Sequence, residues 1–310
     1  MPDSIPFEAE IQEALKYHQN KNFDEAEKHY LKIIKKNPQN SLVLSLYATL
    51  LLEQGKNSEA IEIFKESLLI DPNQPMVYCN LGVAFFKNKE FLIALENYNL
   101  AINMKPDYFE AYRFKAIVLK VLNKPQESLD FFNQAIALNP TFAATYFDLA
   151  NLFEERKLYD DAVKVYDRLI SLMPKNTDAY IYKGNLLHSI DRYSEELDNY
   201  DKAIELGLNV KLILGRKLRS LMYLNDWENF DSLVEEIINQ TNLGLAAANP
   251  FTLLSVIDNP ALIKKSVEQY TNFINPNKNR SYLYWWRWRW WTPFYGNSNP
   301  IIRWFRRRCA

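Results

Sequence analysis

The sequence predicts an all-α fold, a right-handed superhelical solenoid of helix–turn–helix hairpins that repeats every 34 residues. The first observation is a set of five prolines with that spacing: Pro38, Pro72, Pro106, Pro140 and Pro174. The second is that small and aromatic residues recur in step with these prolines. The third is the scarcity of glycine, with 7 in 310 residues, which argues against a fold built from β-turns.

Counting back from each proline places six repeats, at 7–40, 41–74, 75–108, 109–142, 143–176 and 177–210. The eighth position of the repeat is always small, and reads Ala14, Ala48, Gly82, Ala116, Ala150 and Gly184. The twenty-fourth is always aromatic, and reads Tyr30, Phe64, Tyr98, Phe132, Tyr166 and Tyr200. The twentieth is small until the sixth repeat, and reads Ala26, Ala60, Ala94, Ser128, Ala162 and Glu196.

These columns have a physical meaning on helices. Positions 4, 8 and 11 share one helix face, and positions 20, 24 and 27 share another. Small residues let two helices approach closely, and the aromatic ring fills the space between hairpins. Proline at position 32 disfavours helix in the residue before it, so it separates one repeat from the next. One hairpin cannot bury its apolar face alone, so we expect stacked hairpins with a continuous core.

This pattern resembles the tetratricopeptide repeat (TPR), over about two thirds of the chain. The resemblance implies a curved solenoid whose first helices line a concave groove for a peptide, through positions 2, 5, 6, 9, 12 and 13. Candidate groove residues at these positions are Asn80, Lys87, Lys120, Asp148, Asn151, Glu154, Glu155, Asn185 and His188. The alternative is that they form a solvated helix face. Relatives with an asparagine ladder carry asparagine at position 6, and here only Asn80 does, so a ladder that clamps any peptide backbone is not expected.

Beyond the sixth repeat the pattern weakens. Segment 211–240 still shows two amphipathic stretches, and we expect a degenerate seventh helical pair. Segment 241–277 is expected to be a connector with a capping helix at about 261–274. Its phrase NPFTLLSVIDNPALIKKSVEQY, from Asn249 to Tyr270, resembles the connector of the O-linked N-acetylglucosamine transferase (SPINDLY-like) family. That resemblance implies a repeat arm that selects substrates for a glycosyltransferase, but the 35 residues after Asn275 are too few for the catalytic domain.

The C-terminal segment 278–310 differs from the rest in composition. It holds six of the seven tryptophans, eight basic residues and no acidic residue, whereas residues 1–277 carry a net charge of −9. An irregular tail, disordered or read out of frame, is the first interpretation. A membrane-surface anchor, in which tryptophan and arginine interleave, is the second. A packed end-cap for the solenoid is the third.

No residue pattern points to catalysis, to a cofactor or to a metal. The histidines, His18, His29 and His188, have no partner at metal-ligand spacing, and neither a nucleophile elbow nor a glycine-rich phosphate loop occurs. The acidic body offers no net attraction for nucleic acid. Two distant cysteines and an N-terminus unlike a signal peptide favour a cytoplasmic location.

The leading functional hypothesis is therefore a protein–protein interaction scaffold that holds a protein or peptide in the groove, and is not an enzyme. A truncated glycosyltransferase, reduced to its substrate-recognition arm, is the second hypothesis. A peripheral membrane adaptor held by the tail is the third.

Overall fold

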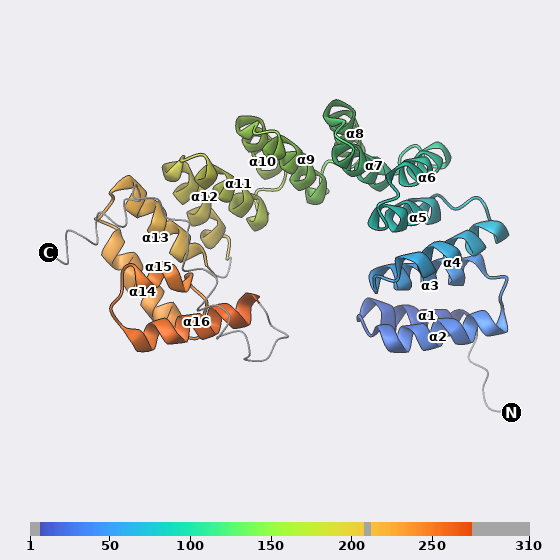
Figure 1. The fold of residues 1–310 in the computed structure, drawn as a ribbon, viewed down its shortest axis with the longest axis horizontal. Helices are drawn as coiled ribbons and strands as arrows, with labels where there is room; N and C mark the ends of the chain where they lie inside the picture. Colours follow the sequence, from blue (N-terminus) through green and yellow to red (C-terminus); the bar gives the residue numbers. More distant parts are fainter. Residues whose placement is uncertain (1–6, 208–211, 275–310) are drawn as a thin grey trace. The chain divides into compact units, whose positions relative to one another are not determined.

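The structure is a computed structural model that describes residues 7–207 and 212–274. All of its regular elements in these ranges are helices (Figure 1). The chain divides into two compact units, unit 1 (Met1–Pro174) and unit 2 (Lys175–Ala310). The division falls directly after the last of the five evenly spaced prolines, and each unit is described by itself below.

Unit 1 consists of five antiparallel hairpins. Its helices are α1 (Phe7–Gln19), α2 (Phe23–Lys36), α3 (Ser41–Glu53), α4 (Asn57–Ile70), α5 (Pro75–Lys87), α6 (Phe91–Met104), α7 (Phe109–Val121), α8 (Pro125–Leu138), α9 (Ala143–Glu155) and α10 (Tyr159–Leu172). Each helix packs against the next one along the chain, and the first helices of neighbouring hairpins also meet, as α3 does with α5, α5 with α7 and α7 with α9. The hairpins follow one another as a stack (Figure 1).

The aromatic residues at repeat position 24 form the centre of the core. All five in unit 1 are at most 2% exposed. Two of these rings also contact the following hairpin: the ring centroids of Tyr30 and Tyr47 are 6.5 Å apart, and those of Tyr98 and Phe114 are 6.0 Å apart. One buried ring thus joins two hairpins, as the sequence pattern predicts.

The spaced prolines end the second helix of each hairpin. The residue before each proline has left the helical conformation, with φ of −141° at Asn37 and −135° at Lys105. Extended backbone at this position relieves the clash with the proline ring. In the sixth hairpin Leu208 takes the place of proline, and α12 instead ends before Gly207, whose φ is +88°. A glycine in the left-handed region is a common alternative way to end a helix.

The turn inside each hairpin also repeats, although its sequence does not. Repeat position 15 has positive φ in all six hairpins, and is occupied by Lys21, Gly55, Lys89, Asn123, Lys157 and Asp191. Its N–H donates to the carbonyl of position 12, and the N–H of position 16 donates to that of position 11, as for Lys89 to Phe86 and Glu90 to Phe85, both at 2.9 Å. These bonds satisfy carbonyls that the end of a helix leaves without partners.

Unit 2 begins with the hairpin of α11 (Thr177–Ser189) and α12 (Tyr193–Glu205). It continues with α13 (Ile213–Leu224), α14 (Phe230–Asn242), the short α15 (Pro250–Leu254) and α16 (Pro260–Ile274). Two Asn-Pro pairs start the last two helices: the Asn249 side chain accepts from the Phe251 N–H, and that of Asn259 from the Leu262 N–H. Both are N-caps followed by proline in the first turn, where its missing N–H costs nothing.

The predicted tail, 278–310, lies outside the described residues, as do residues 275–277 at the end of the predicted connector. Among the described helices, none combines the length and the apolar character needed to cross a membrane. The boundaries of the individual repeats stay a prediction.

The close approach at repeat position 8 gives a stability prediction. A Cβ added at Gly82 would lie 2.6 Å from Cε1 of Tyr98, a ring that is 1% exposed and cannot move aside freely. We therefore expect Gly82→Ala to lower the free energy of unfolding by about 1–3 kcal/mol, as overpacked cores do. Thermal unfolding followed by circular dichroism at 222 nm measures this.

The sign of that change is informative, because helix propensity alone favours alanine over glycine by about 1 kcal/mol. Met76→Ala, at a 62% exposed position of the same helix, is the matched control and should change stability little. A rise in the unfolding temperature of Gly82→Ala would contradict the close contact.

Candidate functional site

Seven of the nine candidate groove residues lie in unit 1, on the first helices α5, α7 and α9. The structure shows that each of them contacts other residues of the solenoid. On α5, Asn80 Nδ2 donates to Thr49 Oγ1 at 3.4 Å, and Lys87 Nζ donates to the carbonyl of Leu52 at 3.1 Å. Both bonds reach from the third repeat back to the first helix of the second.

The polar residues between α7 and α9 form a denser set of bridges. Lys120 Nζ donates to Glu155 Oε1 at 2.8 Å and also contacts Asn151 Oδ1. Arg113 Nε donates to Asp148 Oδ2 at 2.6 Å. Such bridges join the first helices of adjacent repeats, and because they are partly exposed they contribute little stability individually. A ligand on this face can therefore exchange with them at small cost.

Glu154, on α9, has a pKa shifted by its surroundings. Its Oε1 accepts a hydrogen bond from the Tyr166 hydroxyl at 3.1 Å. Burial raises the pKa of Glu154 more than this hydrogen bond lowers it. Its carboxylate is thus bound within its own hairpin.

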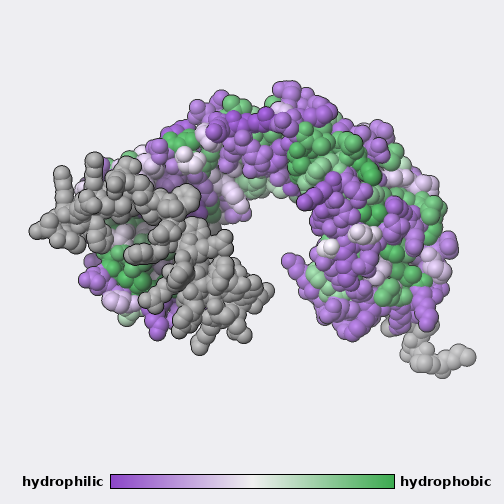
Figure 2. All heavy atoms as spheres, viewed as in Figure 1, coloured by the Kyte–Doolittle hydropathy of each residue, from purple (hydrophilic) through white to green (hydrophobic). Residues whose placement is uncertain are grey.

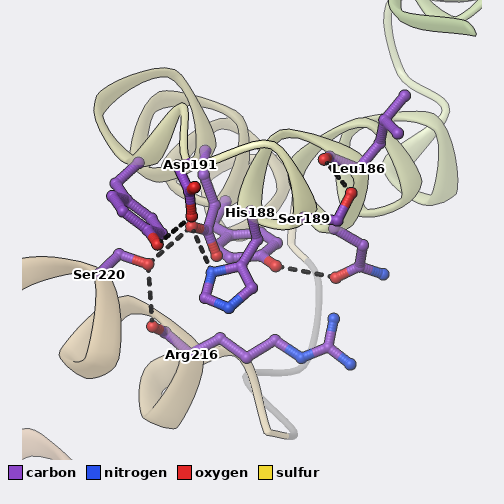
Figure 3. A network of polar contacts seen from close by, with 10 residues as sticks. Leu186, His188, Ser189, Asp191, Arg216 and Ser220 are labelled. Atoms are coloured by element: carbon purple, nitrogen blue, oxygen red, sulfur yellow. Dashed lines mark hydrogen bonds and ion pairs between the residues drawn. The ribbon is translucent and has the colours of Figure 1, made fainter. Parts of the chain in front are cut away.

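The remaining candidates, Asn185 and His188, lie together on α11 in unit 2. They line a cavity of about 320 Å³ together with Tyr200 of α12 and with Arg216 and Arg219 of α13. Figure 3 shows the His188 ring next to the Arg216 side chain. Residues from three helices thus line this one cleft.

A buried carboxylate orders one wall of the cleft. Glu196 is fully buried at repeat position 20, where the other repeats carry alanine or serine. Its Oε2 accepts from Ser220 Oγ at 2.6 Å and lies 2.9 Å from His188 Nδ1 (Figure 3). Since an ionised carboxylate only accepts, Nδ1–H donates and Nε2 is left as the ring nitrogen available for other contacts.

The Tyr200 hydroxyl also lies near the Glu196 carboxylate, and it donates to Asn185 Oδ1 at 2.8 Å. Burial first, and then the charge of Glu196, raises the pKa of Tyr200, so the hydroxyl remains a donor. Because this bond occupies the amide oxygen, the Asn185 Nδ2 donors are left for another acceptor.

An aromatic cluster lies beside the cleft. The rings of Tyr193 and Tyr223 are stacked with centroids 4.6 Å apart, and the His188 ring meets both edge-on, at 5.5 and 6.2 Å. These contacts hold the imidazole in one orientation.

Sequence reasoning missed three members of this cleft, Tyr200, Arg216 and Arg219. Tyr200 was recognised only as a core ring. The two arginines lie in the degenerate seventh pair, where no repeat column assigns them a direction. The signal in the sequence that could have indicated the cleft is Glu196, a charged residue at repeat position 20, where the other repeats carry alanine or serine.

Cys79 is the residue for which the sequence expectation was wrong. Position 5 of its repeat predicts a groove-lining or half-buried thiol, but the side chain is fully buried. Burial raises the pKa of this thiol to about 12, so it is not a reactive nucleophile. Within the described ranges, no three histidine, cysteine or acidic side chains are grouped as a metal site.

Family models of the tetratricopeptide repeat match residues 17–79 and residues 131–164. The fold is a TPR α-solenoid. Both matched stretches lie within unit 1.

The chain is similar to several named proteins over part of its length. The chain is 32% identical over 90 residues to RNA polymerase II-associated protein 3 of Rattus norvegicus, which covers 29% of this chain and 14% of that protein. It is 28% identical over 124 residues to the DnaJ homolog subfamily C member 7 homolog of Schizosaccharomyces pombe, which covers 35% of this chain and 26% of that protein. The match thus spans a small part of each relative's length.

Solved TPR structures resemble the chain more extensively. A tetratricopeptide repeat protein from Parabacteroides merdae superposes with a TM-score of 0.54 at 16% identity, over 85% of this chain and 98% of that one. A thermophilic TPR protein of Thermus thermophilus superposes with a TM-score of 0.52 at 20% identity, over 58% of this chain and 98% of that one. At these identities the likeness concerns the fold alone.

The raised pKa of Glu154 gives a pH-dependent prediction. A carboxyl whose pKa is raised by folding destabilises the protein at any pH where it is ionised in the unfolded chain. We expect Glu154→Gln to unfold about 2 °C higher than the wild type at pH 7, because glutamine keeps an acceptor for Tyr166 and removes the charge. The difference should vanish as the pH falls below about 4.3, the pKa of an unfolded glutamate.

Glu155→Gln is the matched control, since Glu155 is exposed and pairs with Lys120. It should show no such gain at neutral pH. Melting curves of the three proteins between pH 4 and pH 8 decide the matter, and a wild type that is at least as stable as Glu154→Gln at pH 7 would count against the assigned burial effect.

Proposed function

We propose that this chain is a protein-interaction scaffold that binds a peptide or a partner protein along the first helices of its repeats. The observation that carries this proposal is the direct stacking of α3, α5, α7 and α9 on one another. Apart from the buried Leu52 and Cys79, their side chains at positions 2, 5, 6, 9, 12 and 13 therefore form a surface along unit 1. TPR solenoids as a class bind protein partners, which supports the same assignment.

The chemistry of this surface suits a peptide. It offers amides and charges of both signs, and these are held by weak exchangeable bridges. It also exposes apolar side chains at repeat position 2, with Leu42 at 54% and Met76 at 62%. Figure 2 shows hydrophobic and hydrophilic residues interspersed on the face of unit 1 in view. Mixed surfaces of this kind provide both an apolar anchor and hydrogen-bonding groups.

We propose further that the nine candidate residues act in two groups. Those on α5, α7 and α9 exchange their internal bridges for contacts with the ligand. Asn185 and His188 act with the arginines of α13 in the cleft of unit 2. No step of a reaction is assigned to any of them.

The connector's resemblance to the O-linked N-acetylglucosamine transferase family stays a prediction. It concerns residues 249–270, which neither matched TPR stretch includes. The coding sequence around codon 278 tests it, because another reading frame that encodes a long α/β domain would favour a truncated transferase. The membrane-anchor interpretation rests on the tail, outside the described residues.

Selection of peptides on the immobilised full chain tests the scaffold proposal. A random peptide library displayed on phage should yield an enriched consensus on this protein and none on the bare support. The double variant Leu42→Asp/Met76→Asp replaces the exposed apolar residues of two first helices. It should weaken binding of the selected peptide about tenfold or more, because the bound peptide would then remove two carboxylates from water instead of burying two apolar side chains.

The control for this selection is a matched double variant on the second helices, Leu69→Asp/Leu92→Asp, at positions that are 86% and 70% exposed. It changes the net charge equally and should leave peptide affinity within about twofold. Equal losses in both variants, or the absence of any enriched consensus, would refute binding along the first helices.

A further inference from the structure

We propose that the cleft between α11, α12 and α13 binds a dianionic phosphomonoester group, presented by a phosphorylated side chain of the partner peptide. This inference rests on the proposed scaffold function and adds a specific chemistry for the cleft of unit 2. Asn185, Arg216 and Arg219 would donate to the group, His188 lines the same cleft, and Tyr200 holds Asn185 in place.

The first argument is that the two arginines lack acceptors. Within residues 7–207 and 212–274, no ion pair or side-chain hydrogen bond is formed by the guanidinium of Arg216 or of Arg219, and Arg219 Nε is buried without a partner. A buried donor of a charged group that is left unpaired is costly, and a bound anion removes this cost. The spacing of three residues places both guanidinium groups on the same face of α13.

The second argument is that Asn185 supplies an oriented neutral donor. The Tyr200 hydroxyl fixes Asn185 by occupying its amide oxygen, at 2.8 Å, so the Nδ2 donors point to another acceptor. Glu196 holds the His188 ring beside them through Nδ1, at 2.9 Å, and the stacked tyrosines hold the ring plane. An anion in the cleft would thus meet side chains that are already ordered, which reduces the entropic cost of binding.

The third argument is the number of acceptor oxygens that the ligand offers. The Glu196 carboxylate, which adjoins the cleft, is bound to His188 and Ser220, so both guanidinium groups of the cleft are left to another acceptor. A phosphomonoester, which carries about −1.5 to −2 at neutral pH, offers them three strong acceptor oxygens, whereas a carboxylate offers two. Planar guanidinium donors also match the geometry of phosphate oxygens.

The neighbouring hollow shows that the arginines are not part of a generally basic surface. A cavity of about 470 Å³ between α12, α13 and α14 is lined by Asp198, Asp201, Asp226 and Glu236. Lys217, the only basic residue in its lining, contacts Asp201. An anion is therefore directed to the Arg216–Arg219 cleft and away from this acidic hollow.

Proton NMR of the full chain tests the proposal. The chain has three histidines, and His188 alone lies in unit 2, so its ring Hε1 reports on the cleft while His18 and His29 serve as internal references. Titration with inorganic phosphate at constant ionic strength and pH 7.5 should shift the His188 signal saturably, with a Kd on the order of 1 mM. Arg216→Gln and Arg219→Gln should each raise that Kd about tenfold, the usual loss for a charged hydrogen bond.

Lys217→Gln is the matched control, since it removes one positive charge from the same helix, next to Arg216. It should leave the Kd within about twofold. Circular dichroism of each variant verifies the fold. Equal weakening by Lys217→Gln would mean that phosphate binding responds only to net charge. A His188 signal that does not shift at about 20 mM phosphate, 20-fold above the expected Kd, would mean that the cleft does not bind phosphate. Either result overturns the proposal.

Two further ligands define the chemistry. Capped phosphoserine should bind at least as tightly as inorganic phosphate, because a side-chain phosphate on a peptide is the proposed ligand. Acetate should bind at least tenfold more weakly. Acetate that matches phosphate would show a carboxylate site, and phosphate that binds while phosphoserine does not would show a free-ion site; either result overturns the proposal. Since these probes are not peptides, their outcome is separate from that of the library selection.

Discussion

Everything in this solenoid depends on the contact between the aromatic ring at repeat position 24 and the small residue at position 8. The ring must be buried, and it can be buried only if the opposing helix has no side chain in its way. Where position 8 is glycine, as at Gly82 and Gly184, the ring lies so close that even a methyl group would not fit. Because the ring also touches the next hairpin, this contact sets both the packing within a hairpin and the stacking between hairpins.

Stacking of this kind leaves the first helices side by side, and the polar surface follows from it. In unit 1 the bridges from Arg113 to Asp148 and from Lys120 to Glu155 connect equivalent faces of consecutive repeats. They are partly exposed and individually weak, so they order the side chains of this surface but cost little free energy to break. The proposed function uses that property, because a partner can replace such bridges with contacts of its own.

Unit 2 departs from the pattern where a charge enters a small-residue column. Glu196 cannot be buried without partners, and it obtains them from His188 of its own hairpin and Ser220 of the next helix. The same arrangement leaves the arginines of α13 to face an open cleft. A charged residue in the core is thus accommodated by polar partners around it, whereas the other repeats pack alanine or serine there.

The sequence by itself determined the fold class, the spacing of the hairpins and the buried aromatic column, because a strict period reports directly on contacts that recur in every repeat. It also placed Asn185 and His188 on the surface-lining face. Only the tertiary structure decided that these two residues meet Tyr200, Arg216 and Arg219, since the arginines lie beyond the regular array, where no period assigns a face. It likewise decided that Cys79 is fully buried and that the candidates on α7 and α9 bridge one another. Such features depend on which side chains from different helices reach the same point, and periodicity along one chain carries no information about that.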